Sequence, residues 1–304
     1  MYLIFTSRKL RHPLHVISFG SSGTGKTHLQ EKVSQLIPEE DKENLTGLSE
    51  NALYYVGKQH YKNKLILLED LDGALNALYP LRELMSKEWI SKTIPIKNNQ
   101  QGTHSIIKLE VEGPVCVAGC TTKESVYEDN ANRSFLLYLN ESEEQDDQIM
   151  EYQRLKACGL INKNEELEIQ TLFQHTQLVL ESINIRNPYA QHLFLPKEVF
   201  KPRRTNAHYL AFVELVTFYH QYQRRKYKDK ATGEFYINVH LDDIKAANEL
   251  IHEVLLRKSD ELSGPTRNYF ESIKDYLKTK NKKTYTSLET VSYTHLTLPT
   301  TPYV

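Results

Sequence analysis

The chain has 304 residues, of which 39% are hydrophobic and 25% are charged, and its formal net charge is −1. This composition is typical of a globular protein, and without a net positive charge any nucleic-acid contact must come from local patches. No apolar run is long enough to cross a membrane, and the three cysteines have neither metal-site spacing nor the even number of a disulfide framework. These features favour a cytoplasmic protein in a reducing compartment.

The N-terminal part of the chain alternates segments that have the patterns of strands and helices. Continuous apolar runs are typical of strands that are covered on both faces of a sheet. Such runs occur at residues 16–19, 65–68, 115–118 and 135–139. Segments with helical spacing are predicted at residues 2–10, 28–36, 46–61 and 81–91. The alternation predicts an α/β fold, a parallel sheet with helices on both faces.

Further along the chain, residues 93–96 and 105–111 alternate around a polar tip, which predicts a β-hairpin. Helical patterns dominate from residue 145 onward, with a break at Asn187-Pro188. The predicted order is a leading helix at 1–12, a nucleotide-binding core at 13–144, a helical connector at 145–190, an all-α lid at 191–280 and an end segment at 281–304.

The segment after the first apolar run matches the phosphate-binding pattern G-x-x-x-x-G-K-[ST] in full. It reads Gly20, Ser21, Ser22, Gly23, Thr24, Gly25, Lys26, Thr27. Glycines let backbone N–H groups point at a phosphate, and the helix that follows adds the positive end of its dipole. We expect Lys26 to reach the β- and γ-phosphates of ATP, and Thr27 to ligate Mg²⁺. The alternative is a Gly/Ser-rich turn without a ligand.

A second nucleotide motif is predicted where the apolar run at 65–68 ends in Glu69 and Asp70. In P-loop ATPases a carboxylate at this place holds the water shell of Mg²⁺, and the next one polarises the attacking water. We therefore expect Glu69 to act on Mg²⁺ and Asp70 on the water. A solvated strand end is the alternative, because acidic strand ends are common.

Seven stretches together resemble the motifs of the AAA+ P-loop ATPases and, within them, of the MCM-type replicative helicases. The resemblance covers roughly residues 12–262 and is carried by GSSGTGKT, LLEDLD, LRELMSKEWISKTIPI, VCVAGCTT, NANRSFLL, KPRRTNAHYLAFVEL and LDDIKAANELI. It implies an AAA+ core with a parallel sheet, followed by a helical lid, that binds and hydrolyses ATP with Mg²⁺. It also implies a homo-oligomer, in most cases a ring, since one subunit then completes the site of its neighbour.

The resemblance assigns roles around the nucleotide. Thr121, with Cys120 as the alternative, matches the polar residue that contacts the γ-phosphate. Arg133 matches the arginine finger that acts on the ATP of a neighbouring subunit. Arg204, with Arg203 as the alternative, matches the second sensor in the lid.

The resemblance also predicts where DNA is contacted. The family's hairpin carries a basic residue to DNA in the ring channel, and Lys97 at the hairpin tip, or Lys92, is the matching candidate. A basic run at residues 224–230 is a second candidate for DNA contact, although most such runs are only solvated.

The overall pattern resembles the ATPase module of primase-like proteins, with CHC2 zinc-finger and Toprim regions, from bacterial mobile elements. This implies a helicase-type or primase-associated role in DNA replication, on single-stranded DNA, with a primase or other replication proteins as partners. Two alternatives are a nucleotide-switched helicase loader and a regulator that remodels a protein. The family order is Asp then Glu, so the reversed pair Glu69-Asp70 predicts slow hydrolysis and favours the loader.

The end of the chain has an unusual sequence. Residues 291–300 read VSYTHLTLPT and resemble the conceptual translation of a sequencing adapter. We therefore expect residues from about 290 to 304 to take no part in the fold. A natural threonine-rich tail is the alternative.

Overall fold

The computed structural model describes residues 1–97, 104–123, 132–196, 201–258, 273–274 and 277–278. Residues 1–259 form one compact unit, and residues 260–304 form a second. The end segment predicted at 281–304, with the adapter-like stretch, lies outside the described residues. No helix in the described ranges has the length and apolar character needed to cross a membrane.

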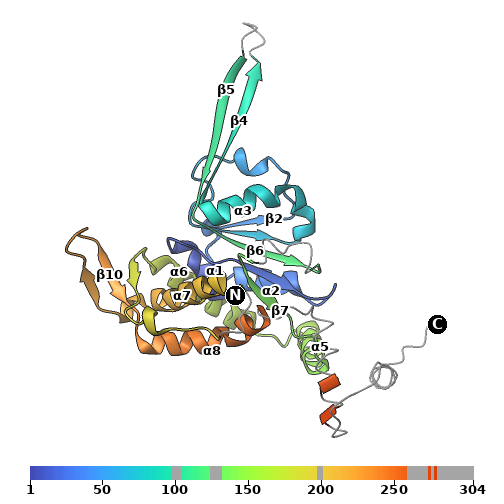
Figure 1. Cartoon of the computed structure of the whole chain (residues 1–304). Coiled ribbons are helices and arrows are strands. Elements are labelled where there is room, and N and C mark those ends of the chain that lie inside the picture. Colours follow the sequence, from blue (N-terminus) through green and yellow to red (C-terminus); the bar gives the residue numbers. More distant parts are fainter. Residues whose placement is uncertain (98–103, 124–131, 197–200, 259–272, 275–276, 279–304) are drawn as a thin grey trace. The chain divides into compact units, whose positions relative to one another are not determined.

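A parallel sheet of five strands forms the centre of the first unit (Figure 1). Its strands are β1 (Val16–Phe19), β2 (Lys42–Leu45), β3 (Lys64–Leu68), β6 (Val115–Thr121) and β7 (Phe135–Tyr138). The order is β2-β3-β6-β1-β7, so β6 lies between β1 and β3. The predicted parallel α/β sheet is therefore confirmed, and the carboxyl ends of β1, β6 and β3 lie next to one another.

The two faces of the sheet are buried by different helices, as the alternation of side chains along β3 illustrates. Leu65 and Leu67 lie in one hydrophobic core, whereas Ile66 and Leu68 lie in the other. The first core is closed by α1 (Tyr2–Thr6), α2 (Lys26–Ser34), α7 (Pro202–Tyr219) and α8 (Leu241–Lys258). The second is closed by α3 (Leu78–Lys87) with the 3₁₀ segments Ala52–Tyr54 and Leu71–Ala77. Both faces are thus covered, which explains the continuous apolar runs.

The predicted hairpin is confirmed as β4 (Trp89–Lys97) and β5 (His104–Glu112), which pair in antiparallel register. Figure 1 shows it extending away from the sheet on the side of α3. The polar residues at its turn lie outside the described part of the chain. Ile106 and Trp89 are exposed on it, so this element is not held by a hydrophobic core along its whole length.

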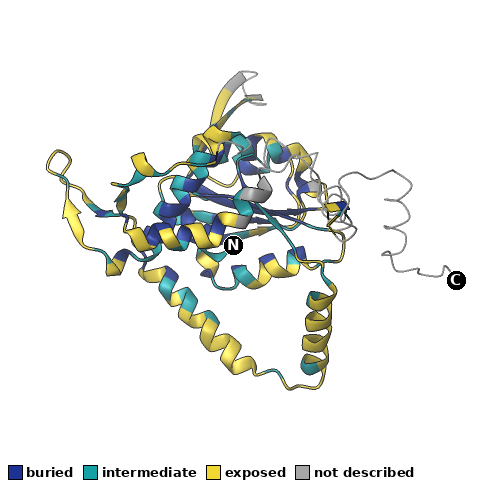
Figure 2. Ribbon diagram, turned by 60° about the horizontal axis from the view of Figure 1, so that its bottom comes forward, coloured by how far each residue is buried: buried dark blue, intermediate teal, exposed yellow. Residues whose placement is uncertain are grey.

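Most of the segment predicted as a helical connector at 145–190 is helical and consists of α5 (Glu143–Ala157) and α6 (Lys163–Val179), but its end also contains a strand, β8 (Asn184–Arg186), which was not predicted. No residue of α5 is buried, and Figure 2 shows both helices largely exposed. The end of α6 is anchored, because the buried side chain of Gln177 accepts from Arg8 and donates to the hydroxyl of Thr6. The helical hairpin is therefore attached at its ends and exposed between them.

The prediction of an all-α region at residues 191–280 is wrong. Strands β9 (Lys226–Lys228) and β10 (Phe235–Asn238) form an antiparallel hairpin, and β10 also pairs in parallel with β8 (Asn184–Arg186). The turn is built by the carboxylate of Asp229, which accepts from the N–H groups of Ala231 and Thr232, and by Gly233 at a φ of +75°. In addition, α7 and α8 share the core of the sheet rather than a core of their own.

Candidate nucleotide-binding site

The phosphate-binding loop connects β1 to α2, as its sequence predicts. Gly23 and Gly25 have φ angles of +84° and +87°, in the left-handed region that glycine adopts without strain. The helix begins at Lys26, directly after Gly25. Its first N–H groups therefore open toward the loop, and such a helix start attracts anions.

The base of the loop is packed against a residue far away in the sequence. A Cβ atom on Gly20 would lie 2.8 Å from Oγ1 of Thr24 and 3.1 Å from Oε1 of Glu141. The carboxylate of Glu141 accepts from the backbone N–H of Ser21 at 2.8 Å and from its hydroxyl at 3.0 Å. Thr24 donates its hydroxyl hydrogen to the carbonyl of Ser21 at 2.9 Å. No sequence motif marks Glu141 as part of the site, since only the fold brings the end of β7 to the loop.

The ammonium group of Lys26 lies over the loop. The side chain is buried, and Nζ donates to the carbonyl oxygen of Gly20 at 2.8 Å and to that of Ser21. This places a positive charge at the mouth of the loop, where the terminal phosphates of a nucleotide are expected.

The predicted site residues converge on a pocket of about 410 Å³, here called the P-loop pocket. The residues predicted to act on Mg²⁺, water and the γ-phosphate all line it, together with part of the loop: Ser22, Gly23, Gly25, Lys26, Thr27, Glu69, Asp70 and Thr121. The register of the sheet explains this, because Thr121 pairs with Phe19 and Gly119 pairs with Leu68. Inserting β6 between β1 and β3 thus places Thr121 between the loop and the carboxylates.

Cys120 and Thr121 differ in chemistry although both line the pocket. Burial raises the pKa of the Cys120 thiol to about 11, so it is neutral, and its Sγ donates to the amide oxygen of Gln30 at 3.4 Å. Gln30 in turn donates to the carbonyl of Leu68 at 3.2 Å. Gln30, which no sequence motif marks, therefore connects α2 to the end of β3 before Glu69. Thr121 keeps a hydroxyl that accepts from the N–H of Lys123 at 3.0 Å and has its own hydrogen to donate.

The residues present fit Mg²⁺ as it is held in nucleotide sites. Mg²⁺ keeps several waters and takes one or two protein oxygens together with substrate phosphates. Thr27, Glu69 and Asp70 supply such oxygens around the pocket. In the described part of the chain no group of three or more His, Cys, Asp or Glu side chains could hold a metal by itself. A metal ion held as in other nucleotide sites would share its coordination between these oxygens and the phosphates.

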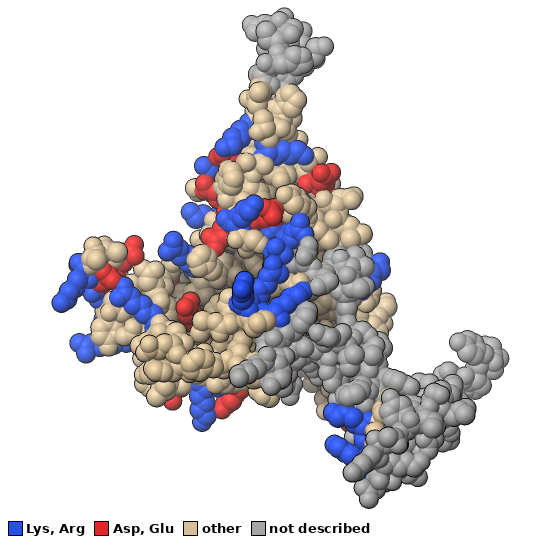
Figure 3. All heavy atoms as spheres, in the orientation of Figure 1, with Lys and Arg blue, Asp and Glu red and all other residues tan. Residues whose placement is uncertain are grey.

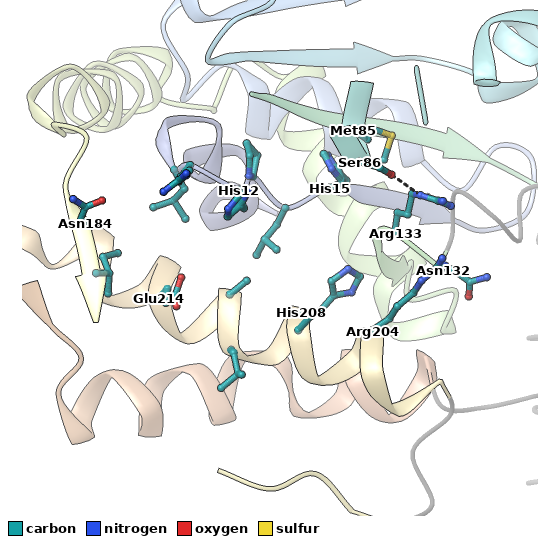
Figure 4. Close-up of a pocket in the computed structure, with 18 of the residues that line it drawn as sticks. His12, His15, Met85, Ser86, Asn132, Arg133, Asn184, Arg204, His208 and Glu214 are labelled. Carbon is teal, nitrogen blue, oxygen red and sulfur yellow. Dashed lines mark hydrogen bonds between the residues drawn. The ribbon is translucent and has the colours of Figure 1, made fainter. Parts of the chain in front are cut away.

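A second pocket, of about 840 Å³, contains both predicted arginines and is here called the arginine pocket (Figure 4). Arg133 donates from Nε to the hydroxyl of Ser86 at 2.7 Å. Arg204 and His208, one helical turn apart on α7, point toward Arg133 and Asn132 (Figure 4). Of the two alternatives at the start of α7, Arg204 lines this pocket and Arg203 does not.

The arginine pocket lies at the amino ends of the strands, opposite the P-loop pocket. Arg133 is two residues before β7, and the N–H of Phe135 donates to the carbonyl of His15, which directly precedes β1. Burial lowers the pKa of His15 to about 4, and Nδ1 accepts from the N–H of Val117 at 3.2 Å. The structure therefore does not bring Arg133 or Arg204 to the P-loop of the same chain.

The two lysines predicted to contact DNA lie at different places on the β4–β5 hairpin. Lys92 bonds to the side chain of Asn51, and its Nζ lies 5.7 Å from the centroid of the Tyr54 ring. It belongs to the base of the hairpin, where it is half-buried. Lys97 is the last residue of β4, opposite His104, and its side chain lies outside what the structure describes. Contact with DNA stays a prediction for both.

Comparison with known proteins supports the nucleotide site. Residues 3–181 match the family model described as the MTBMA_p00010 P-loop domain. The chain is also similar to an uncharacterized protein, MTBMA_p00010, of Methanothermobacter marburgensis, with 24% identity over 277 residues. That alignment covers 87% of this chain and 33% of the relative, so the chain spans about a third of the relative's length. With more than half of its residues matched by the family model, the chain belongs to the MTBMA_p00010 P-loop domain family and has an α/β P-loop NTPase fold.

Proposed function

We propose that this chain is an ATPase module of the AAA+ type, whose active site is completed by a second copy of the chain. The observation that carries the proposal is the separation of two sets of predicted catalytic residues. Lys26, Thr27 and Asp70 line one pocket, whereas Arg133 and Arg204 line another. One pocket lies at the carboxyl ends of the strands and the other at their amino ends. Because a strand rises about 3.3 Å per residue, the four residues of β1 alone separate these two ends by roughly 10 Å.

Within one subunit, the residues of the P-loop pocket bind and orient ATP. The N–H groups of the loop and of the first turn of α2 hold the phosphates, and the ammonium of Lys26 turns from the loop carbonyls to the β- and γ-phosphates. Thr27 and Glu69 would hold Mg²⁺, which neutralises developing phosphate charge when bound. Asp70 polarises the attacking water, and the hydroxyl of Thr121 orients it or the γ-phosphate.

The neighbouring subunit supplies positive charge to the transition state. Among the described residues the guanidinium group of Arg204 has no hydrogen-bond or ion-pair partner, and it shares its pocket with Arg133. If the arginine pocket of one copy faces the P-loop pocket of the next, both cations lie near the γ-phosphate. Such a head-to-tail contact uses different surfaces on the two copies and closes into a ring when the rotation permits.

The proposed task of this ATPase is movement along single-stranded DNA during replication of a mobile element, as a helicase or together with a primase. The resemblance to MCM-type helicases and to primase-associated modules supports it, as does the β4–β5 hairpin that extends from the nucleotide-binding sheet. A hairpin of this kind can carry Lys97 toward a strand that passes along the oligomer.

The test is ATP turnover measured against protein concentration, with and without single-stranded DNA. We expect turnover per chain to rise cooperatively with concentration, since the finger comes from a neighbour, and to rise again with DNA. Lys26→Ala should abolish turnover and weaken ATP binding about tenfold or more, because a charge-assisted contact to phosphate is lost. The matched control is Lys32→Ala, which removes an exposed cation from the same helix. Turnover that is independent of concentration would contradict the shared site.

A further inference from the structure

The small sheet that replaces the predicted all-α lid carries a row of stacked side chains on one face. The rings of Tyr227 and Tyr236 stack with centroids 5.6 Å apart and an interplanar angle of 26°. The guanidinium of Arg186 lies 3.9 Å from the centroid of Tyr236, and that of Arg225 lies 5.5 Å from the centroid of Tyr227. This row crosses all three strands and is here called the tyrosine–arginine ladder.

The register shows that the ladder occupies the face opposite the core. Tyr236 pairs with Tyr227 on one side and with Asn184 on the other, so these side chains share a face. On the other face Ile237 is fully buried and Ile185 packs against the main core. The hydrophobic core therefore holds the sheet from one side and leaves the ladder in solvent, where Tyr227, Arg186 and Arg225 are exposed.

Positive charge is in excess around the ladder. Arg186 is fixed by an ion pair with Asp229, and this pairing, with two backbone N–H bonds, lowers the pKa of Asp229 to about 2. Within the described residues, Arg225, Lys228 and Lys230 have no ion-pair partner. Figure 3 shows Lys and Arg gathered where β9 and β10 lie, with some acidic side chains among them.

We infer that the tyrosine–arginine ladder binds single-stranded DNA. Every base has a π-face, so bases can stack on the exposed ring of Tyr227 and on the guanidinium groups of Arg186 and Arg225, which already lie over tyrosine rings. Arg225, Lys228 and Lys230, which have no ion-pair partner in the described part of the chain, lie in or next to the β9–β10 hairpin and can track the phosphates. Because stacking requires unpaired bases, we expect this surface to bind single-stranded DNA more tightly than duplex DNA.

The ladder is distinct from the P-loop pocket, so the inference goes beyond the proposed ATPase and requires no nucleotide. At the β8 side of the sheet, Asn184 and Ile185 also line the arginine pocket. Strands β8, β9 and β10 contribute nothing to the P-loop pocket. A ladder that only stabilised its own hairpin would not account for the excess of unpaired cations beside it. A single strand bound at this face would give the ATPase a second contact with DNA, away from the β4–β5 hairpin.

The experiment is fluorescence anisotropy of labelled oligothymidylate with the full chain at low salt. We expect Tyr227→Ala to weaken binding roughly fivefold or more, because the stacking surface is lost, and Tyr227→Phe to bind as the wild type does. Arg225→Ala should weaken binding and lower the slope of log K against log salt by about 0.7. Lys26→Ala should bind DNA normally, so this result is separate from the ATPase proposal.

Two matched controls address general effects on the fold and on charge. Tyr79→Ala removes another exposed tyrosine, whose ring lies under Arg82 on α3, and Lys156→Ala removes an exposed cation from α5. Neither should change DNA binding, and ATP turnover without DNA should be unchanged in Tyr227→Ala. Wild-type DNA affinity in Tyr227→Ala, or equal affinity of the wild type for a duplex of the same length, would overturn the inference.

Discussion

His15 shows how one buried side chain at the arginine pocket makes stability depend on pH. Burial, together with the nearby charge of Arg133, lowers the pKa of His15 from 6.5 to about 4 despite a hydrogen bond with the backbone of Met85. Between these values the unfolded chain binds a proton that the folded chain does not bind. The contribution of neutral His15 to the free energy of unfolding is therefore complete above pH 6.5. As the pH falls from 6.5 toward 4, the free energy of unfolding decreases by about 3 kcal/mol.

The matched variant is His15→Asn, which keeps an acceptor for the N–H of Val117 but does not titrate. Urea unfolding of both proteins from pH 7 to pH 4 measures the difference. We expect the wild type to lose more free energy of unfolding than the variant over this range. Equal losses would show that other groups carry the pH dependence.

At the residue scale, the sequence predicts contacts that are local and misses those that the fold creates. The loop from Gly20 to Thr27 is one continuous motif, so its role can be read from spacing alone. The contact between Glu141 and Ser21 joins residues that are 120 positions apart in the sequence, and no motif predicts it. Arg204 was matched by resemblance to a sensor, but only the packing of α7 shows that it lies beside Arg133.

At the element scale, a buried carboxylate holds α7 and α8 together. Asp243, at the start of α8, accepts from the hydroxyl of Thr217, the ring of His220, the guanidinium of Arg224 and the N–H of His240. Burial alone would raise its pKa, but these hydrogen bonds outweigh it and lower the pKa to about 2. The carboxylate therefore stabilises the fold above pH 3.8, and this contribution is lost as the pH falls toward 2.

Asp243→Ala should destabilise the chain by about 3 kcal/mol, because it leaves Arg224 and three other donors without their acceptor. Asp242→Ala is the matched control, since Asp242 is 82% exposed and pairs only with His240 among the described residues. It should change the unfolding free energy by about 0.5 kcal/mol or less. Chemical denaturation of both variants at neutral pH measures the difference, and similar values for the two would contradict the role of Asp243.

Four strands of the central sheet, β1, β3, β6 and β7, were predictable because their apolar runs are continuous and bounded. The fifth, β2 with the polar sequence KENL, was not predicted, and neither were the strands of the small sheet. The segments KYK and FYIN have three and four residues, which is too short to show a clear alternation of apolar and polar side chains. Pairing with β8, which is distant in the sequence, stabilises them. The helix predicted at residues 46–61 is wrong, because only Ala52–Tyr54 form a 3₁₀ turn and Gly57 has a φ of +105°. In both segments the secondary structure is determined by tertiary contacts rather than by the local sequence pattern.

At the scale of the whole molecule, the order of strands decides which residues can act together. The alternation of strands and helices predicts a parallel sheet, but many strand orders satisfy it. The order β2-β3-β6-β1-β7 places Thr121 beside the loop and the carboxylates, and it leaves the arginines at the other edge. Under the proposed function, in which Arg133 acts as a finger, a complete catalytic set on this fold requires two copies in head-to-tail contact.

The most direct test of this account is ATP turnover in a mixture of Lys26→Ala and Arg133→Ala chains. Each variant alone lacks one half of every site, so we expect both to be inactive. In a mixture, Arg133→Ala supplies an intact P-loop and Lys26→Ala supplies an intact finger, so random assembly should restore about a quarter of the wild-type turnover. No recovery at any protein concentration, although Arg133→Ala binds ATP and both variants assemble, would contradict a site shared between subunits.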